Sequence, residues 1–337
     1  MNRLVDIPRI ELVGQPTLLQ RLQRTELLLR RPGLYVKRDD LMATAMGGNK
    51  LRSLEYWLGA AQQMRADVLL VAGTALSNLC RLTAAAASMT GLECLVFHNS
   101  ADDAASRRAS FLNRIFGASV HYLGSMDEQQ RAQTVAAAAA QLERQGRRPY
   151  IIGDPALGAL GYVRAAEELA NQCREMGLPI RHVFLPGSMG TTEAGFILGN
   201  ALLGHPFEVH LVSVEYQEAE LRERVRRIYE STAALIGMEG EPFDSARVRC
   251  HMGFLGAGYA QSTPEAECAI LSFARTEGLV LEPIYSGKTF ACFLELARTQ
   301  ALAAAEPMCV MHTGGVPSLF SQFESFRELP LDEETRR

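Results

Sequence analysis

Lysine is almost absent from this chain of 337 residues. Of its 34 basic residues only three are lysines, Lys37, Lys50 and Lys288, and all the others are arginines. An arginine side chain stays charged in proteins, whereas a lysine amine loses its proton when its surroundings lower its pKa. Any reaction that needs a titratable amine therefore has three candidate residues.

The chain also lacks the features of several other classes of protein. Its seven cysteines are scattered and form no C-x-x-C pair, which argues against a disulfide framework or a structural zinc and favours a reducing compartment. A net charge of −4 gives no basic surface for nucleic acid. Neither a signal peptide nor a long apolar span is recognisable. We expect a cytoplasmic protein with no nucleic-acid or membrane partner.

Short apolar runs alternate with longer amphipathic runs from about Leu34 onward, which predicts an α/β fold with parallel sheets covered by helices on both faces. Since no flexible linker or repeat is present, one α/β unit is expected to be nested in another. The predicted strands are 34–37, 67–72, 93–98, 119–122, 149–152, 182–185, 208–215, 248–251 and 308–312. The predicted helices are 49–64, 78–90, 104–116, 128–145, 160–176, 192–203, 218–236, 264–277 and 287–299.

Ligands of such sheets bind where strands turn into helices, and the junction at 46–50 reads Met-Gly-Gly-Asn-Lys. Its glycines permit a tight turn, and Asn49 is a candidate N-cap. Lys50 then falls in the first turn of a helix, where a positive charge opposes the helix dipole. It is either a surface lysine paired with Glu55 or Asp40, or an amine with a lowered pKa that is available as a nucleophile.

Two further junctions offer donors for anions. At 73–78, Ser77 and Asn78 start a helix, where they are either a plain N-cap or part of a carboxylate site. At 185–195, glycines and hydroxyl side chains lie between an apolar strand and an apolar helix. This junction has neither the Walker spacing nor the dinucleotide fingerprint, so a single phosphate is the expected ligand.

Two late segments, 282–288 and 312–317, again end strand-like runs with small polar residues. Tyr285 is a candidate general acid and Ser286 a candidate hydrogen-bond partner, although both residue types are also common in turns. A lysine on a loop, a single-phosphate site and a carboxylate-binding helix start are together typical of pyridoxal phosphate acting on an amino acid.

Motifs along most of the chain resemble one family of enzymes. They are LYVKRDDL at 34–41, GGNK at 47–50, SN at 77–78, GAGY at 256–259, EPIYSGK at 282–288 and HTGG at 312–315. In these residues the chain is similar to the 1-aminocyclopropane-1-carboxylate deaminase and D-cysteine desulfhydrase family of pyridoxal-phosphate enzymes. The resemblance implies a homodimer of fold type II, with two doubly wound α/β domains. The large domain would comprise residues 1–48 and 153–337, and the small nested domain residues 49–152.

The resemblance also implies roles for individual residues. Lys50 would bind the cofactor covalently and, once freed, remove the α-proton of the substrate. The implied catalytic residues are Lys50, Ser77, Tyr259 and Tyr285. The implied cofactor-binding residues are Lys50, Asn78, Gly187, Ser188, Met189, Gly190, Thr191, Thr192 and Ser286. The implied substrate-binding residues are Ser77, Asn78 and Leu79, and no metal is implied.

Ser286 is expected to lie beside the pyridine nitrogen, where cyclopropane deaminases have a glutamate and desulfhydrase-like members a hydroxyl. A serine does not hold the nitrogen protonated as a carboxylate does, which favours loss of a β-substituent. We therefore expect a D-cysteine desulfhydrase-like lyase that forms a 2-oxo acid and ammonia. The alternatives are a cyclopropane deaminase, a β-replacement synthase and an inactive cofactor-binding regulator.

The chain departs from the family in two places. Leu76 and Leu79 flank Ser77 and Asn78, where the family has polar residues, and the 187–192 loop lacks adjacent glycines. Apolar side chains near the substrate predict a preference for bulkier or less polar β-substituted alanines over D-cysteine.

Overall fold

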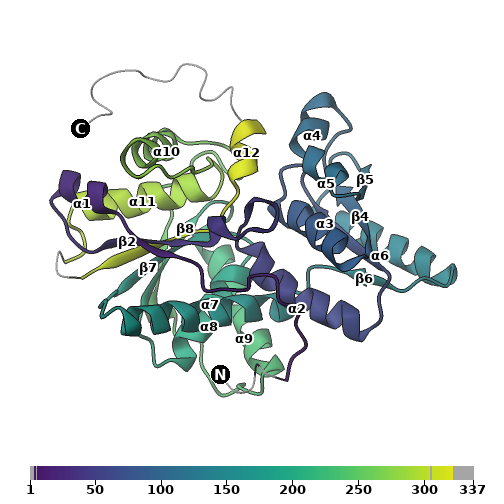
Figure 1. Cartoon of the computed structure of the whole chain (residues 1–337), viewed down its shortest axis with the longest axis horizontal. Coiled ribbons are helices and arrows are strands. Elements are labelled where there is room, and N and C mark those ends of the chain that lie inside the picture. The colour runs from purple at the N-terminus through teal and green to yellow at the C-terminus, as the bar shows by residue number, and fades with distance from the viewer. Residues whose placement is uncertain (1–3, 5, 304–305, 322–337) are drawn as a thin grey trace.

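The strands form two sheets in the computed structural model, which describes residues 4, 6–303 and 306–321 (Figure 1). The six-stranded sheet has the order β1 (Leu19–Arg21), β2 (Leu34–Arg38), β10 (Met308–His312), β7 (His182–Gly187), β8 (Glu208–Ser213) and β9 (Val248–His251). The four-stranded sheet has the order β5 (Ser119–Tyr122), β4 (Glu93–His98), β3 (Val68–Gly73) and β6 (Pro149–Ile151). All neighbouring strands are parallel except β1 and β2, which confirms the predicted α/β class.

Helices connect the strands and cover the sheets. The first six are α1 (Gln23–Leu29), α2 (Lys50–Gln63), α3 (Asn78–Thr90), α4 (Ala104–Ala109), α5 (Phe111–Ile115) and α6 (Glu128–Arg144). The others are α7 (Pro155–Glu175), α8 (Thr191–Leu202), α9 (Glu218–Leu235), α10 (Pro264–Glu277), α11 (Ser286–Arg298) and α12 (Val316–Ser321). The order also contains the short 3-10 helices η2 (Asp39–Leu41), η3 (Thr44–Met46) and η4 (Ser245–Arg247).

The predicted elements differ from the structure in a few places. The antiparallel strand β1 and the helices α1 and α12 were not predicted, because each is too short to show a periodic pattern. The helix predicted at 104–116 is divided at Ser110, whose hydroxyl donates to the carbonyl of Ser106 and contacts the Tyr122 hydroxyl at 2.7 Å. Helix α7 begins earlier than predicted because Asp154 caps it and Pro155 occupies its first position.

Figure 1 shows the four-stranded sheet with α3–α6 on one side of the molecule and the six-stranded sheet with its helices on the other. The four strands of the smaller sheet are consecutive in the chain, whereas β1 and β2 precede them and β7–β10 follow them. The nested domain at 49–152 stays a prediction.

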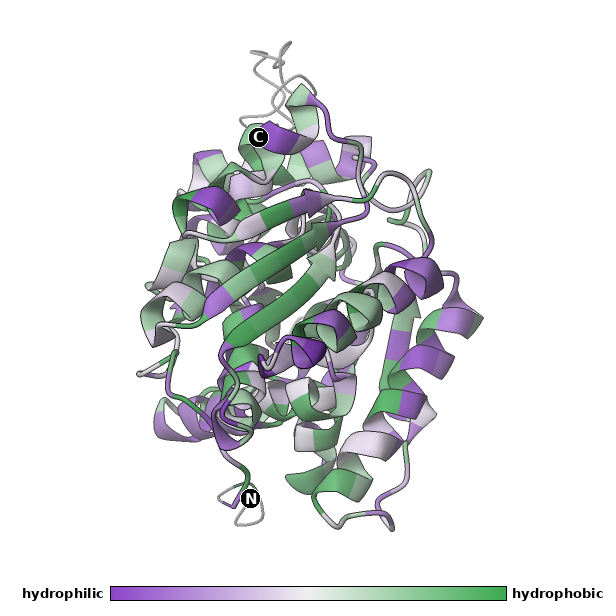
Figure 2. Ribbon diagram, turned by 90° about the vertical axis from the view of Figure 1, so that its right-hand side faces the viewer, coloured by the Kyte–Doolittle hydropathy of each residue, from purple (hydrophilic) through white to green (hydrophobic). Residues whose placement is uncertain are grey.

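Apolar side chains fill the space between the strands and helices. Every residue of β7 and β10 is buried, and Figure 2 shows apolar strands inside an outer layer of more hydrophilic helices. Burial of these continuous apolar strands on both faces is the main stabilising contribution to such a sheet. Among the described residues, no helix has the length and apolarity needed to cross a membrane.

Two close contacts between helices fix the positions of α2 and α8 against α7. A Cβ atom at Gly161 of α7 would lie 2.3 Å from the backbone of Arg52 in α2, and one at Gly195 of α8 would lie 2.1 Å from the carbonyl oxygen of Ala159 in α7. Only glycine allows these approaches. The starts of α2 and α8 are therefore fixed against the same helix.

Candidate active site

A cavity of about 720 Å³ lies where strands of both sheets end. Its walls include residues that directly follow β3, β4, β7 and β10, namely Thr74, Asn99, Ser188 and Thr313. Ten of the residues implied by the family resemblance line it: Lys50, Ser77, Asn78, Leu79, Ser188, Met189, Thr191, Thr192, Tyr259 and Tyr285. Gly187 and Gly190 belong to the loop at 187–192 (the α8 loop) but do not line the cavity, and neither does Ser286, which is fully buried. Leu76, expected as a wall, is not among the lining residues.

Lys50 is the first residue of α2, and Asn49 links this helix start to two other loops. The Asn49 amide donates to the carbonyl of Thr313 at 3.0 Å, and its side chain donates to the Thr192 hydroxyl at 2.9 Å. The expected N-cap at Asn49 is therefore wrong. Asn49 already has helical backbone angles, whereas a capping side chain needs an extended backbone.

The acidic partners considered for Lys50 are engaged elsewhere. Glu55 pairs with Arg9 at 2.7 Å, and Asp40 pairs with Arg38 at 2.7 Å. Within the described part of the chain, no hydrogen bond or ion pair reaches the Lys50 amine. The amine is therefore available to a ligand in the cavity.

Burial lowers the pKa of Lys50 below its ordinary value of 10.5, although the nearby carboxylates of Glu193 and Glu215 oppose this change. A lowered pKa increases the fraction of neutral, nucleophilic amine. The other two lysines are not available in this way: Lys37 is buried in an ion pair, and Lys288 donates to two backbone carbonyls. Lys50 is thus the one lysine of the chain placed to act as a nucleophile.

The start of α3 presents hydrogen-bond donors to the same cavity. The Ser77 hydroxyl caps the helix by accepting from the Cys80 amide at 3.3 Å. The side-chain oxygen of Asn78 accepts from Arg81 at 3.1 Å, which leaves its amide group as a donor. Because the first amides of a helix have no partner within the helix, this end has the donors that a carboxylate requires.

Arg81 orients Asn78, and sequence reasoning missed it. The guanidinium is buried and donates to the backbone carbonyls of Ala45 and Gly47, and it has no carboxylate partner in the described residues. Burial lowers its pKa to about 10. Arg81 follows Asn78 by three residues, so both side chains lie on one face of the helix. This spacing could have predicted the contact from the sequence.

The α8 loop forms an open anion site. Its last glycine, Gly190, is the N-cap of α8 with φ +96°, and no side chain caps the helix. A Cβ atom there would lie 2.9 Å from the side chain of Ile228. The amides of Thr191 and Thr192 are therefore available to a phosphate, whereas the amides of Ser188, Gly190 and Glu193 interact with the Glu193 carboxylate.

Two carboxylates contact this loop, and neither was predicted. The Ser188 amide donates to Glu193 at 2.5 Å, and the Ser188 hydroxyl donates to Glu215 at 2.5 Å. Burial raises the pKa of Glu193. This favours its neutral form, so Glu193 is compatible with an anion bound at the same loop.

Tyr259 and Tyr285 form a pair on the wall of the cavity. Their hydroxyl groups are 2.7 Å apart, and burial raises the pKa of both phenols. Both are therefore protonated at neutral pH, and one can pass a proton while the other replaces it.

Ser286 lies against a buried carboxylate, Glu282. The Ser286 hydroxyl is 3.1 Å from a Glu282 oxygen, and this carboxylate also accepts from the amides of Ile284, Tyr285 and Ser286. Burial raises the pKa of Glu282. The motif EPIYSGK was recognised in the sequence, but the contact between its first residue and Ser286 was not predicted.

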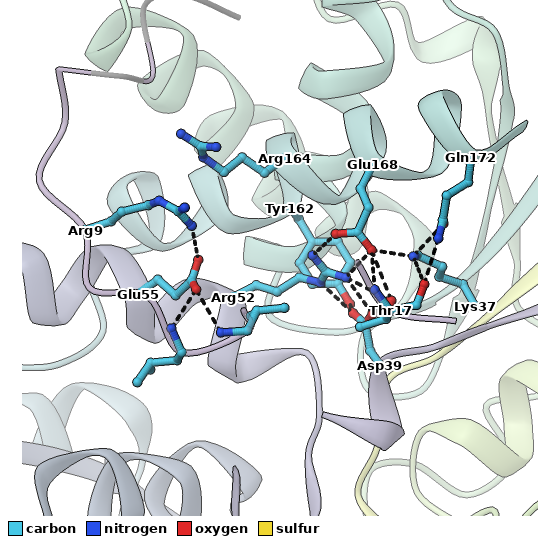
Figure 3. A network of polar contacts seen from close by, with 12 residues as sticks. Arg9, Thr17, Lys37, Asp39, Arg52, Glu55, Tyr162, Arg164, Glu168 and Gln172 are labelled. Atoms are coloured by element: carbon cyan, nitrogen blue, oxygen red, sulfur yellow. Dashed lines mark hydrogen bonds and ion pairs between the residues drawn. The ribbon is translucent and has the colours of Figure 1, made fainter. Parts of the chain in front are cut away.

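A buried network of ion pairs and hydrogen bonds joins α2 to neighbouring elements (Figure 3). Arg52, two residues after Lys50, binds Asp39 through two nitrogens at 2.8 and 2.9 Å and Glu168 at 2.8 Å. Tyr162 donates to Asp39 at 2.6 Å, and Lys37 pairs with Glu168. The network joins α2 to β2, η2 and α7, and so fixes the helix that presents Lys50.

A sequence model described as "Pyridoxal-phosphate dependent enzyme" matches residues 10–314. The chain belongs to the pyridoxal-phosphate-dependent enzymes. Among its relatives, a protein named D-cysteine desulfhydrase from Serratia proteamaculans is 34% identical over 95% of this chain and 97% of its own length. A Yersinia pestis protein of the same name is 35% identical, with the same coverage.

Solved structures show the same fold. A protein described as an ACC deaminase homologue has a TM-score of 0.86 and 28% identity and covers 96% of each chain. A fungal L-serine ammonia-lyase from Rhizomucor miehei has a TM-score of 0.66 and 17% identity and covers 94% of this chain and 99% of its own. These similarities confirm the expected fold type II architecture.

The site of this pyridoxal-phosphate-dependent enzyme fits the cofactor. A free amine with a lowered pKa is what the aldehyde group requires. An uncapped helix start suits the phosphate, and the Asn78 amide suits the ring hydroxyl.

Proposed function

We propose that the protein is a lyase that eliminates the β-substituent of a small amino acid and forms a 2-oxo acid and ammonia. The free amine of Lys50, in a cavity that also holds the uncapped start of α8, is the observation that supports this most strongly. The relatives named D-cysteine desulfhydrase support the type of reaction.

In this proposal the cofactor is held by Lys50 at its aldehyde carbon, by the α8 loop at its phosphate and by Asn78 at its ring hydroxyl. Ser286 would be the partner of the ring nitrogen. When bound, pyridoxal phosphate withdraws electrons from the Cα atom of the amino acid. Ser77 and the amides of Asn78 and Leu79 hold the substrate carboxylate.

The remaining steps are proton transfers by the protein. The neutral Lys50 amine removes the α-proton, a step that general-base catalysis accelerates by about 10²–10⁴-fold. The bond from Cβ to its substituent breaks, the electron pair leaves with that substituent, and the Tyr259–Tyr285 pair supplies a proton to it. Water converts the released 2-aminoacrylate to pyruvate and ammonia.

A second candidate is a 1-aminocyclopropane-1-carboxylate deaminase, because the ACC deaminase homologue has the same fold over nearly the whole chain. Ser286 favours elimination over ring opening, since a hydroxyl does not hold the ring nitrogen protonated as a carboxylate does. The products separate the two: pyruvate from a β-substituted alanine, 2-oxobutanoate from the cyclopropane. A new amino acid, or no product, would instead indicate a β-replacement synthase or a regulator.

Replacing the lysine tests the proposal. Wild type should contain pyridoxal phosphate with visible absorbance that borohydride abolishes. Both Lys50→Ala and the charge-conserving Lys50→Arg should lose that absorbance, and pyruvate formation should fall at least about 10³-fold. Normal turnover by either variant, or wild type that binds no cofactor after reconstitution, would contradict the proposal.

On the family resemblance we further propose a homodimer in the cytoplasm. Sedimentation of the cofactor-loaded protein at several concentrations tests the dimer.

A further inference from the structure

Besides Lys50, the described residues of the cavity wall include one cation, and it has no acidic partner. The acidic residues of the wall are engaged elsewhere: Glu193 and Glu215 both contact the α8 loop, and Glu128 pairs with Arg224 at 3.3 Å. Arg131, in the first turn of α6, lines the same cavity and joins no ion pair with a described residue.

Arg131 is nevertheless held in place. One of its nitrogens donates to the side-chain oxygen of Asn99 at 3.2 Å, and the amide of Asn99 donates to the carbonyl of Gly73 at 3.2 Å. Gly73 ends the strand that leads to Ser77. The guanidinium is thus tied to the wall that is proposed to hold the substrate carboxylate, with most of its five N–H donors unused.

A second observation places this charge near the substrate side of the cavity. Burial raises the pKa of the Cys80 thiol to about 11, and the positive charge of Arg131 opposes that rise. Cys80 lies in the first turn of α3, three residues after Ser77. The field of Arg131 therefore reaches the helix start where a substrate would bind.

Part of the cavity wall is apolar. It includes Leu79 of α3 and also Ala132 and Val135, which lie on the same helix as Arg131. Methylene groups of a substrate side chain can pack against these apolar residues without a loss of binding free energy. Beyond them the end of the side chain would meet the guanidinium of Arg131, which has no acidic partner. Guanidinium groups bind carboxylates and other oxyanions through short, charge-assisted hydrogen bonds.

We propose that Arg131 binds an anionic group at the far end of the substrate side chain. The substrate is then a β-substituted alanine whose leaving group ends in a carboxylate or another oxyanion. This inference rests on the proposed elimination reaction. For a thioether substrate, the Cα–H proton passes to Lys50 and its electron pair forms the Cα=Cβ double bond. The Cβ–S bond breaks with its electron pair going to sulfur, the Tyr259–Tyr285 pair protonates that sulfur, and the thiol leaves with its anionic group on Arg131.

Matched substrates test this inference. S-(2-carboxyethyl)-cysteine and its neutral isostere S-(2-carbamoylethyl)-cysteine have the same leaving sulfur and the same length, and S-(2-sulfoethyl)-cysteine tests another oxyanion. Both enantiomers of each are assayed for pyruvate. Wild type should prefer the anionic compounds by about 10–100-fold in kcat/KM, mainly through KM. Arg131→Gln should bring that ratio close to one, and Arg131→Lys should give an intermediate ratio.

Arg144→Gln is the control, because Arg144 is exposed on the same helix and contacts only Gln141 among the described residues; it should keep the wild-type ratio. Equal kcat/KM values for the anionic and neutral compounds in wild type, or a preference retained in Arg131→Gln, would overturn the inference while pyruvate formation still supported the lyase.

A binding measurement separates the two proposals further. Trp57 is the sole tryptophan and lines the cavity, so its fluorescence reports binding without turnover. If no compound gives pyruvate, the lyase fails, yet tighter binding of the anionic compounds that Arg131→Gln abolishes would still support the anion site. Equal binding of charged and neutral compounds would refute the site.

Discussion

Lys37, Lys50 and Lys288 have the same side chain and three different environments. Two of them donate to fixed acceptors in the protein, and only Lys50 has a free amine in the cavity. The helix-start position of Lys50 predicted this difference, because a cation there is unfavourable unless it is neutral or paired. Leu76 and Leu79 show the limit of such reasoning: both were predicted to line the pocket, but only Leu79 does.

A substitution at Ser286 tests its buried contact with Glu282. Ser286→Glu introduces a second carboxyl beside the buried Glu282, whose oxygen lies 3.1 Å from the present hydroxyl. Two carboxyl groups in one buried site share a proton, and the larger side chain overfills the space, so unfolding in urea should show a loss of about 1–3 kcal/mol.

The double variant Glu282→Gln with Ser286→Glu removes the repulsion and should recover part of that stability. In this double variant a carboxyl group again faces the ring nitrogen, so exchange of the α-hydrogen with deuterated water should increase relative to pyruvate formation. An unchanged ratio would mean that residue 286 is not the neighbour of the nitrogen.

At the scale of elements, three of the helices that begin at the cavity do so in different ways. Ser77 caps α3, α8 has no side-chain cap, and α2 is held by Asn49 through the Thr192 hydroxyl. An uncapped start is stable only with water or a ligand at its amides, so α8 is the helix best suited to a phosphate. Helix α2 is also held in position by Arg52, which joins it to a buried network of ion pairs.

Replacing Arg52 tests this positioning role. Arg52→Met leaves the buried carboxylates of Asp39 and Glu168 without a major partner, so the free energy of unfolding should fall by about 3–5 kcal/mol. Arg52→Lys keeps the charge but loses the two-pronged contact, and should recover only part of this loss.

Arg107→Gln is a control at an exposed ion pair. Arg107 pairs with Asp102, and both side chains are more than half exposed, so its loss should leave the free energy of unfolding nearly unchanged. Displacement of Lys50 in Arg52→Met should also weaken the visible absorbance of bound cofactor. Normal stability together with normal absorbance would contradict the role of the network.

At the scale of the whole molecule, the six-stranded sheet contains a row of imidazoles away from the cavity. His210 lies 3.1 Å from His182 and 2.9 Å from His251, on three neighbouring strands, and its ring stacks on Phe184. Burial, together with the neighbouring His251, His182 and Arg249, lowers the pKa of His210 to about 2. The folded protein therefore keeps His210 neutral.

This burial makes folding sensitive to pH. The unfolded chain binds a proton at His210 below its ordinary pKa of 6.5, whereas the folded chain does not. The stability is thus fully present above pH 6.5 and is lost as the pH falls, by about 2 kcal/mol between pH 7 and pH 5 for this residue. His210→Phe, which keeps a stacked ring, should reduce that loss in urea titrations at the two pH values.

The exposed His121 provides a control, since His121→Gln should leave the loss at its wild-type size. An equal pH dependence in wild type and His210→Phe would show that the row of imidazoles does not take part.

The sequence alone determined the α/β class, the elements with clear periodicity and the lysine, because these depend on local patterns and on residue types that have few other uses. The tertiary structure decided which polar groups have partners. Arg81, Glu193 and Glu215 were not recognised, and Arg131 was not distinguished from 30 other arginines. Their surroundings are formed by segments far apart in the chain, and burial and charge depend on those segments meeting at the carboxyl ends of two sheets.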